Sequence, residues 1–284
     1  MEPPTEDTPQ AWVSGLEFEH LTPLRRVLKA LVVHPFANYF PSPLLRAVLR
    51  LTRSELAAAN WVDPGGWRSM VISYHNHAPR LVDRLLVGLG TIPMALRNRR
   101  RLVSRVLARL IDRAGHEPVH VLCLGAGPGH NINDALVECA REAHATLVDL
   151  SSDAFAHGRD LAMERGTGGR IRFVQGDVVD VAKMLDRPTD VAQMVGICEY
   201  LADEQVVAIA RTVAEVMDRG APLVANSLSK AHGTDRFFRR VFDLHMIHRS
   251  PGELERLFGS AGFGGFVALP EPLGVYHILI GRRL

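Results

Sequence analysis

The chain has 284 residues, of which 47% are apolar and 23% charged, a composition typical of one ordinary globular domain with an extension. Its 33 basic and 31 acidic side chains leave a net charge of +2, so charge alone predicts neither a nucleic acid nor an anionic membrane as partner. No apolar run approaches the roughly 20 residues that span a bilayer, and residues 1–10 lack the features of a secretory signal. Cys123, Cys139 and Cys198 fall on predicted core elements, and we interpret them as free thiols of a cytoplasmic protein.

We expect a flexible N-terminal arm over residues 1–18, followed by a helical lid region over residues 19–117. Apolar residues at helical spacing, with a proline in the first turn of one segment, support this interpretation. The predicted helices are Leu24–His34, Pro43–Leu51, Arg53–Asn60, Arg68–Val87 and Leu96–Ala114. The last of them begins with four arginines, which we interpret as a solvated helix face, with an acidic substrate as the alternative. These arginines are Arg97, Arg99, Arg100 and Arg101.

From His120 onward, short apolar strands alternate with helices, which predicts an α/β fold with a parallel sheet covered on both faces. The predicted strands are Val121–Leu124, Ala145–Asp149, Ile171–Val174, Val191–Gly196, Pro222–Ser227, Phe266–Leu269 and Val275–Gly281. The turn between the last two strands is short, so these two strands must run antiparallel.

The first of these strands ends in a glycine-rich turn, Leu-Gly-Ala-Gly-Pro-Gly-His, at residues 124–130. Gly125, Gly127 and Gly129 let backbone N–H groups approach a ligand, and the start of the following helix adds a positive partial charge. The turn therefore predicts a nucleotide-type cofactor site. A dinucleotide fingerprint would place its third glycine at His130, and a phosphate-binding loop would need a lysine that is absent nearby.

This Gly-x-Gly-x-Gly turn after a buried strand resembles motif I of class I S-adenosylmethionine (SAM) dependent methyltransferases. Two carboxylates strengthen the resemblance, since Asp149 ends the second strand and Asp177 ends the third. The segment from Arg249, Arg-Ser-Pro-Gly-Glu-Leu-Glu-Arg-Leu-Phe, is similar to the helix before the sixth strand of many small-molecule methyltransferases. The resemblance covers residues 118–284 and implies a Rossmann-like seven-stranded sheet that binds SAM.

The resemblance also implies cofactor contacts. Asp149 would accept hydrogen bonds from both ribose hydroxyls, unless it only caps the following helix. Asp177 would accept the adenine amino group, with the next backbone amide on a ring nitrogen, unless Asp177 is only a turn residue. The residues from Gly196 to Glu199 would line the methionine part. The predicted cofactor-binding residues are Gly125, Ala126, Gly127, Gly129, Asp149, Leu150, Asp177, Val178, Gly196 and Glu199.

Candidates for the chemistry come from the helical region and from strand ends, where the resemblance implies that Asn226 and Ser227 point toward the pocket. An aromatic face at Tyr200 would stabilise the sulfonium cation, although a packed aromatic residue is the alternative. Tyr74 and His77 share a helical face but could equally belong to a solvated cluster. His245 is a candidate general base but could equally lie at the surface or in the core. The predicted catalytic residues are Tyr200, Ser227, Asn226, Tyr74, His77 and His245. No spacing of His, Asp or Glu suggests a divalent metal, so we expect none.

The fourth strand is followed by Ile-Cys-Glu-Tyr, where relatives that methylate nucleobases or glutamine carry Asn/Asp-Pro-Pro-Tyr. The resemblance therefore argues against nucleic acid and release-factor substrates. It favours in-line methyl transfer to a small molecule, in secondary metabolism, under a lid that excludes water. The layout is similar to that of a bacterial group of methyltransferases.

Two alternatives remain open. In the first, SAM is its own substrate and cyclises to azetidine-2-carboxylate and methylthioadenosine, as in azetidine-2-carboxylate synthases. In the second, the chain binds SAM without catalysis. The oligomeric state stays undetermined.

Overall fold

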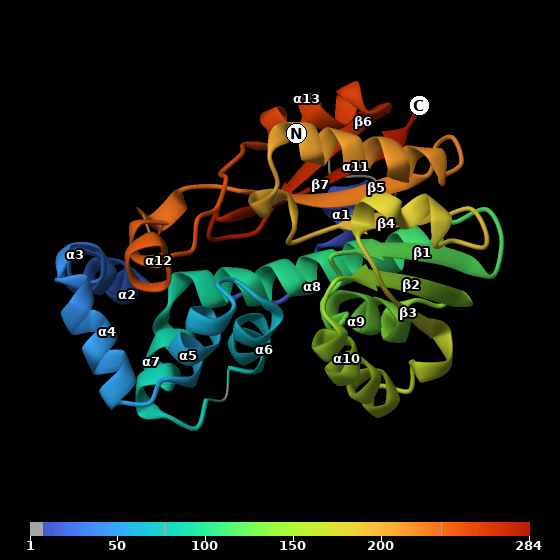
Figure 1. Ribbon diagram of the computed structural model, residues 1–284. Helices are drawn as coiled ribbons and strands as arrows, with labels where there is room; N and C mark the ends of the chain where they lie inside the picture. The colour runs from blue at the N-terminus through green and yellow to red at the C-terminus, as the bar shows by residue number, and fades with distance from the viewer. Residues whose placement is uncertain (1–7, 77, 234) are drawn as a thin grey trace.

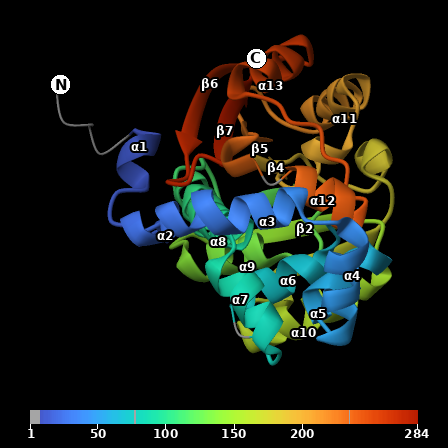
Figure 2. The same cartoon turned by 90° about the vertical axis from the view of Figure 1, so that its left-hand side faces the viewer.

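The structure is a computed structural model that describes residues 8–76, 78–233 and 235–284. Figures 1 and 2 show a twisted sheet with helices on both faces, and a group of N-terminal helices at one side of the molecule. Within the described residues, no helix is long and apolar enough to cross a membrane.

The sheet has seven strands in the order β3-β2-β1-β4-β5-β7-β6. Neighbouring strands from β3 to β5 are parallel, and β7 runs antiparallel to both β5 and β6. The seven predicted strands and the fold class are confirmed. The strands are β1 Val119–Leu124, β2 Ala143–Asp149, β3 Ile171–Gln175, β4 Val191–Met194, β5 Pro222–Leu228, β6 Phe263–Pro270 and β7 Tyr276–Arg283.

Thirteen α-helices are found in the described part of the chain. They are α1 Pro9–Trp12, α2 Pro23–Leu28, α3 His34–Tyr39, α4 Ser42–Leu51, α5 Glu55–Val62, α6 Trp67–His75, α7 Leu81–Leu89, α8 Thr91–Asp112, α9 His130–Glu138, α10 Ser152–Glu164, α11 Asp203–Glu215, α12 Asp235–Phe242 and α13 Pro251–Ser260. Side chains of α8, α9 and α10 share one hydrophobic core with β1, and α11 and α13 pack on the opposite face of the sheet. Every residue of β1 is buried, as expected for a central strand covered on both faces.

Two predicted helices differ from the structure. The helix predicted to end at His34 continues to Tyr39, because a π-helical turn over Lys29–Val33 precedes Pro35. The wider turn accommodates a proline that has no N–H to donate. The helix predicted over Arg68–Val87 is two helices, α6 and α7, since Asn76 adopts a left-handed conformation with φ of 51°.

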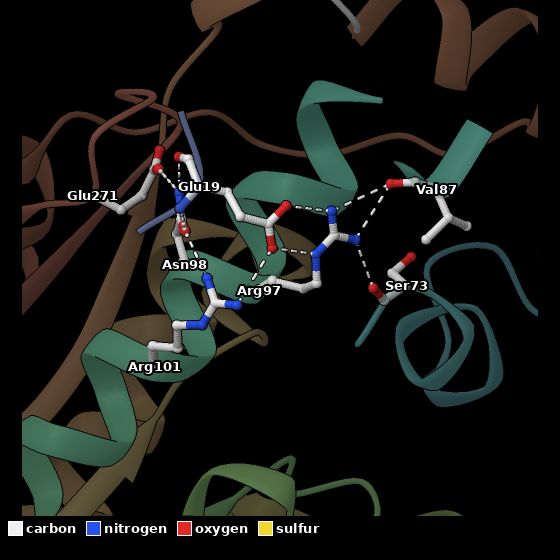
Figure 3. Close-up of polar contacts among 7 residues, drawn as sticks. All are labelled: Glu19, Ser73, Val87, Arg97, Asn98, Arg101 and Glu271. Carbon is white, nitrogen blue, oxygen red and sulfur yellow. Dashed lines mark hydrogen bonds and ion pairs between the residues drawn. The ribbon is translucent and has the colours of Figure 1, made fainter. Parts of the chain in front are cut away.

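The arginines at the start of α8 are only partly a solvated face. Arg97 is 5% exposed and pairs with Glu19 through Nε–Oε1 and Nη2–Oε2 contacts of 2.6 and 2.7 Å. Its remaining N–H groups donate to the carbonyls of Ser73 and Val87 (Figure 3). Arg99 is also buried, at 2% exposed, so the predicted solvated face is wrong for both residues.

Residues 8–18 of the predicted arm contact the core. Trp12, in α1, is 6% exposed, and the Arg113 guanidinium lies 4.7 Å from its ring centroid. The domain boundaries after residues 18 and 117 stay predictions.

Candidate cofactor cleft and apolar cavity

A cleft of about 240 Å³ lies at the carboxyl ends of β1, β2 and β4. In parallel sheets this edge is where ligands bind, because the strand order reverses there. The glycine turn forms one wall of the cleft, and helix α6 forms another through Trp67, Met70 and Tyr74. The cleft therefore lies between the sheet and the helical region.

The backbone of the glycine turn requires glycine. Gly125, Gly127 and Gly129 have φ values of 57°, 51° and 78°, which side chains strongly disfavour. A Cβ on Gly125 would lie 1.9 Å from the Ile197 side chain, whereas a Cβ on Gly127 would meet only Trp67, at 3.6 Å. The turn is therefore packed tightly against Ile197 at Gly125 and is open toward the cleft at Gly127.

Asp149 is held in place by the turn that it faces. Its Oδ2 accepts the N–H of Gly127 at 2.8 Å, and its Oδ1 accepts the N–H of Ser151 at 2.9 Å. Each carboxylate oxygen keeps a lone pair for a further donor. The cap of helix α10 is Ser151, whose Oγ accepts the N–H of Ala154, so the alternative of Asp149 as helix cap is wrong.

A stack of rings borders the cleft around His130, the first residue of α9. The His130 ring lies 6.0 Å from the ring of His157 and 5.4 Å from that of Tyr74. Burial lowers the pKa of His130 to about 3, with Arg100 adding to the effect, so the imidazole is neutral at pH 7. Neither ring nitrogen has a partner within the described residues. The sequence showed this histidine only as a mismatch to the dinucleotide fingerprint.

Arg99 reaches the cleft from α8, and Glu199 lies behind it. The ion pair between Arg99 Nη1 and Glu199 Oε1 measures 3.5 Å, and both side chains are 3% exposed. Arg99 Nη2 is 3.4 Å from the Tyr74 hydroxyl. Burial raises the pKa of Glu199, and the facing guanidinium opposes that shift. Glu199 itself is not among the residues lining the cleft.

Six of the ten predicted cofactor residues line the cleft: Gly125, Ala126, Gly127, Gly129, Asp149 and Gly196. Leu150, Asp177, Val178 and Glu199 do not. Leu150 is 68% exposed beside Asp149, and Asp177 accepts the N–H of Val179 at 3.1 Å. The contacts of these four residues with adenine or methionine stay predictions.

A second cavity, of about 350 Å³, lies under the N-terminal helices. Its walls are mostly apolar and combine α2 to α7 with α12, which comes from the other end of the chain. Gly65 and Met70 line both this apolar cavity and the cleft, so the two adjoin. Tyr200 lines the apolar cavity, and its hydroxyl lies against Gly65 at the junction.

The other catalytic candidates differ in position. Tyr74 lines the cleft, whereas His77 lies outside the described residues. Asn226 and Ser227 are each 1% exposed and line neither cavity, so the prediction that they face the pocket is wrong. Asn226 is a positioning residue, since its Oδ1 accepts the N–H of Gly196 at 2.7 Å.

The prediction of His245 as a base in the pocket is also wrong. Its side chain is 65% exposed beside Asp243, and it lines neither cavity. The segment after α12 turns this histidine outward and Leu244 inward, a choice that the letters alone do not reveal.

The seven-stranded sheet and the glycine-turn cleft are those of a class I SAM-dependent methyltransferase. The chain belongs to the family described as "Putative methyltransferase", whose model matches residues 73–283.

Two curated relatives match part of the chain. "Uncharacterized protein YnbC" from Escherichia coli (strain K12) is 27% identical over 218 residues, which cover 72% of this chain and 37% of YnbC. "Phenazine O-methyltransferase PhzM" from Lysobacter antibioticus is 29% identical over 181 residues, which cover 61% of this chain and 51% of PhzM. The chain thus spans between about a third and a half of the length of these relatives.

Solved structures share the fold. Magnesium protoporphyrin IX methyltransferase (ChlM) from Synechocystis PCC 6803, crystallised with bound SAH, aligns with a TM-score of 0.58 at 15% identity. The alignment covers 84% of this chain and 99% of ChlM.

Proposed function

We propose that the chain is a SAM-dependent methyltransferase whose acceptor is an apolar small molecule. The observation that carries this proposal is the junction at Gly65 and Met70 between the cofactor cleft and an apolar cavity. A methyl transferase needs two such sites in contact, one for the donor and one for the acceptor.

The cleft fits SAM by its donor and acceptor groups. Asp149 offers free lone pairs of the kind that bind a ribose, and Gly127 leaves room beside the backbone. When bound, SAM would supply a methyl group already activated on a sulfonium. The bound SAH in ChlM and the family membership support this choice of cofactor.

The apolar cavity indicates the class of acceptor. Phenylalanine side chains from α3 and α12, at Phe36, Phe237 and Phe238, favour a flat apolar molecule. Asn38 lines the same cavity at 2% exposed, and its Oδ1 has no partner within the described residues. An acceptor with a hydroxyl or amine would satisfy that oxygen.

The chain's own part in the reaction is alignment and exclusion of water. The helices above the cleft place the acceptor cavity against the cofactor site, and Tyr200 stands between them with its hydroxyl at Gly65. The name of the Lysobacter relative supports a small-molecule acceptor and, more loosely, secondary metabolism. A cytoplasmic location is part of this proposal.

The test is an incubation of the purified protein with SAM and a mixture of phenolic and amine-bearing aromatic molecules, analysed by mass spectrometry. We expect S-adenosylhomocysteine (SAH) together with an equal amount of a product heavier by one CH₂. Binding of SAM without any product would contradict catalysis. Incubation with SAM alone tests the cyclase alternative, which the relatives do not support and which would yield methylthioadenosine.

A further inference from the structure

The apolar cavity has another neighbour besides the cofactor cleft. A third cavity, of about 600 Å³, lies where α2 and the π-helical turn face the segment between β6 and β7. Its other walls include His20, Arg26 and Pro272, which are exposed, so this third cavity faces solvent. None of the described residues that it shares with the apolar cavity lines the cleft. The shared residues are Leu21, Lys29, His34 and His232.

Lys29, in the π-helical turn, is a half-buried cation with no carboxylate beside it. Its Nζ donates to Oγ1 of Thr91, a buried residue that also lines the apolar cavity. Within the described residues no Asp or Glu pairs with Lys29, and burial lowers its pKa to about 8. The amine therefore keeps most of its charge at pH 7. An ammonium has three N–H donors and Thr91 accepts one of them, so the others are left for a further acceptor.

The buried arginines of the described chain show what this wall lacks. Each of them faces a carboxylate at 3.5 Å or less. The pairs are Arg97 with Glu19, Arg99 with Glu199, and Arg249 with Asp203. By contrast, no Asp or Glu among the described residues lines the apolar cavity or the third cavity. Because burying an ammonium without a counterion is costly, the anion that Lys29 lacks is expected to come from a ligand.

The charge of this wall matches a carboxylate. The Nε2 of His232 lies 2.7 Å from the carbonyl oxygen of Leu273, and the pKa of His232 is lowered by burial first and also by Lys29, so the imidazole is neutral at pH 7. Arg25 lines the apolar cavity from α2 but is exposed, so water and salt screen its charge. Lys29 thus supplies the half-buried positive charge. One carboxylate neutralises it, whereas a phosphate monoester would bring a second negative charge into an apolar cavity.

We propose that Lys29 binds a carboxylate of the acceptor, so that the acceptor is a flat aromatic acid whose ring lies among the phenylalanines of the apolar cavity. This inference rests on the proposed function, because it assumes that the apolar cavity holds the acceptor. The cofactor is excluded as the source of the carboxylate, since Lys29 does not line the cleft. The junction with the cleft, at Gly65 and Met70, and the wall at Lys29 have no residue in common. The carboxylate therefore anchors the acceptor away from the group that faces the methyl donor.

The test measures by calorimetry, with SAH at saturation, the binding of two matched probes: naphthalene-2-carboxylate and its neutral amide, naphthalene-2-carboxamide. The wild-type protein should bind the acid about tenfold more tightly than the amide, the gain expected for hydrogen bonds to a charged group. Lys29→Met keeps the apolar stem and removes the charge, so the acid should lose about tenfold in affinity and the amide should change by less than about threefold. Lys29→Arg should keep the preference for the acid, because it keeps the charge.

Lys183→Met is the matched control, because Lys183 pairs with Asp180 at the surface and its side chain is 81% exposed. That variant should bind both probes as the wild type does. Equal binding of acid and amide by the wild type, binding of neither probe, or an unchanged preference in Lys29→Met would overturn the inference. Tighter binding of 2-naphthyl phosphate than of the acid would overturn the choice of a carboxylate. If Lys29→Met does not fold, the same comparison in Lys29→Gln decides. Failure of the wild-type protein to bind SAH would instead refute the proposed function.

Discussion

The cofactor cleft is built on one glycine turn and two neighbouring strand ends, with Tyr74 of α6 and Arg99 of α8 added from the helical region, whereas the walls of the apolar cavity come from residues between Leu21 and Tyr276. The cleft is held by hydrogen bonds that involve the backbone, such as the one from the Gly127 N–H to the Asp149 carboxylate. The cavity is held by side-chain packing between helices and by side chains that donate to backbone carbonyls of a neighbouring helix, as Arg46 and Trp61 do to Val241. This difference suggests that the donor site is rigid and specific, and that the acceptor site can change by substitution of single apolar residues.

The largest effect is expected from Asp149→Ala. The two ribose hydroxyls of SAH would each lose a charge-assisted hydrogen bond of about 2 kcal/mol to the carboxylate. SAH should therefore bind about a thousandfold more weakly in calorimetry. Asp153→Ala is the control, since Asp153 forms an exposed ion pair with Arg68 and is not among the described residues that line the cleft. If Asp149→Ala keeps its affinity for SAH, Asp149 does not bind the methyl donor, and the contrast between donor site and acceptor site fails.

Arg97→Met should destabilise the junction between the helical region and the sheet without entering either site. Removing the cation takes its donors from the carbonyls of Ser73 and Val87 and leaves Glu19 with the 3.5 Å pair to Arg101, at a cost of about 3 kcal/mol in the free energy of unfolding. Urea denaturation measures this loss, with Arg101→Met as the matched variant. A loss below about 0.5 kcal/mol, as for a surface pair, would contradict the structural role.

His130 should make the free energy of unfolding decrease at acid pH. Its pKa is about 3 in the folded protein against an ordinary value of 6.5, so the unfolded chain binds more protons between these values. Stability from this group is therefore present above pH 6.5 and is lost as the pH falls toward 3, by about 2 kcal/mol at pH 5.

His130→Phe should lack that part of the pH dependence in urea unfolding at pH 7 and pH 5. His144→Phe, at a partly exposed position on β2, should keep it. Equal pH dependence in the wild type and in His130→Phe would show that the imidazole is not the group responsible.

The smallest effect is expected from filling the apolar cavity. Ala37→Trp projects an indole into it and should lower kcat/KM for the acceptor about tenfold, with SAH affinity unchanged. Ala47→Trp, on the exposed surface of α4, is the control. Parallel loss of SAH affinity and turnover would mean that the two sites are not separable.

The same contrast explains how much the sequence could predict. The strands, the glycine turn and Asp149 follow from local patterns, because buried parallel strands and tight turns restrict the residues that fit. The break after Asn76 carries a signal that the helix prediction overlooked, because Pro79 lies inside the predicted segment and a proline ends a helix near the residues before it. The burial of Arg97 depends on Glu19, 78 positions away in sequence, so a helix pattern alone could only suggest a solvated face.

The sequence also could not show in which direction the side chains point at the ends of strands and helices. Asn226 and Ser227 were expected to face the pocket, but the antiparallel neighbour β7 helps to bury them. The apolar cavity could not be predicted either, since α12 packs on α3, α4 and α5 although the first five strands lie between them in sequence. His130 and Arg99 were visible as letters, but their unpartnered nitrogens appear only in three dimensions.

The most direct test of the central claim is a crystal structure with SAH. We predict the ribose on Asp149, the amino-acid end toward Arg99, and the sulfur at the junction beside Gly65 and Met70, facing the apolar cavity. A sulfur atom directed away from that junction, or a ribose bound elsewhere, would contradict the account of adjoining donor and acceptor sites.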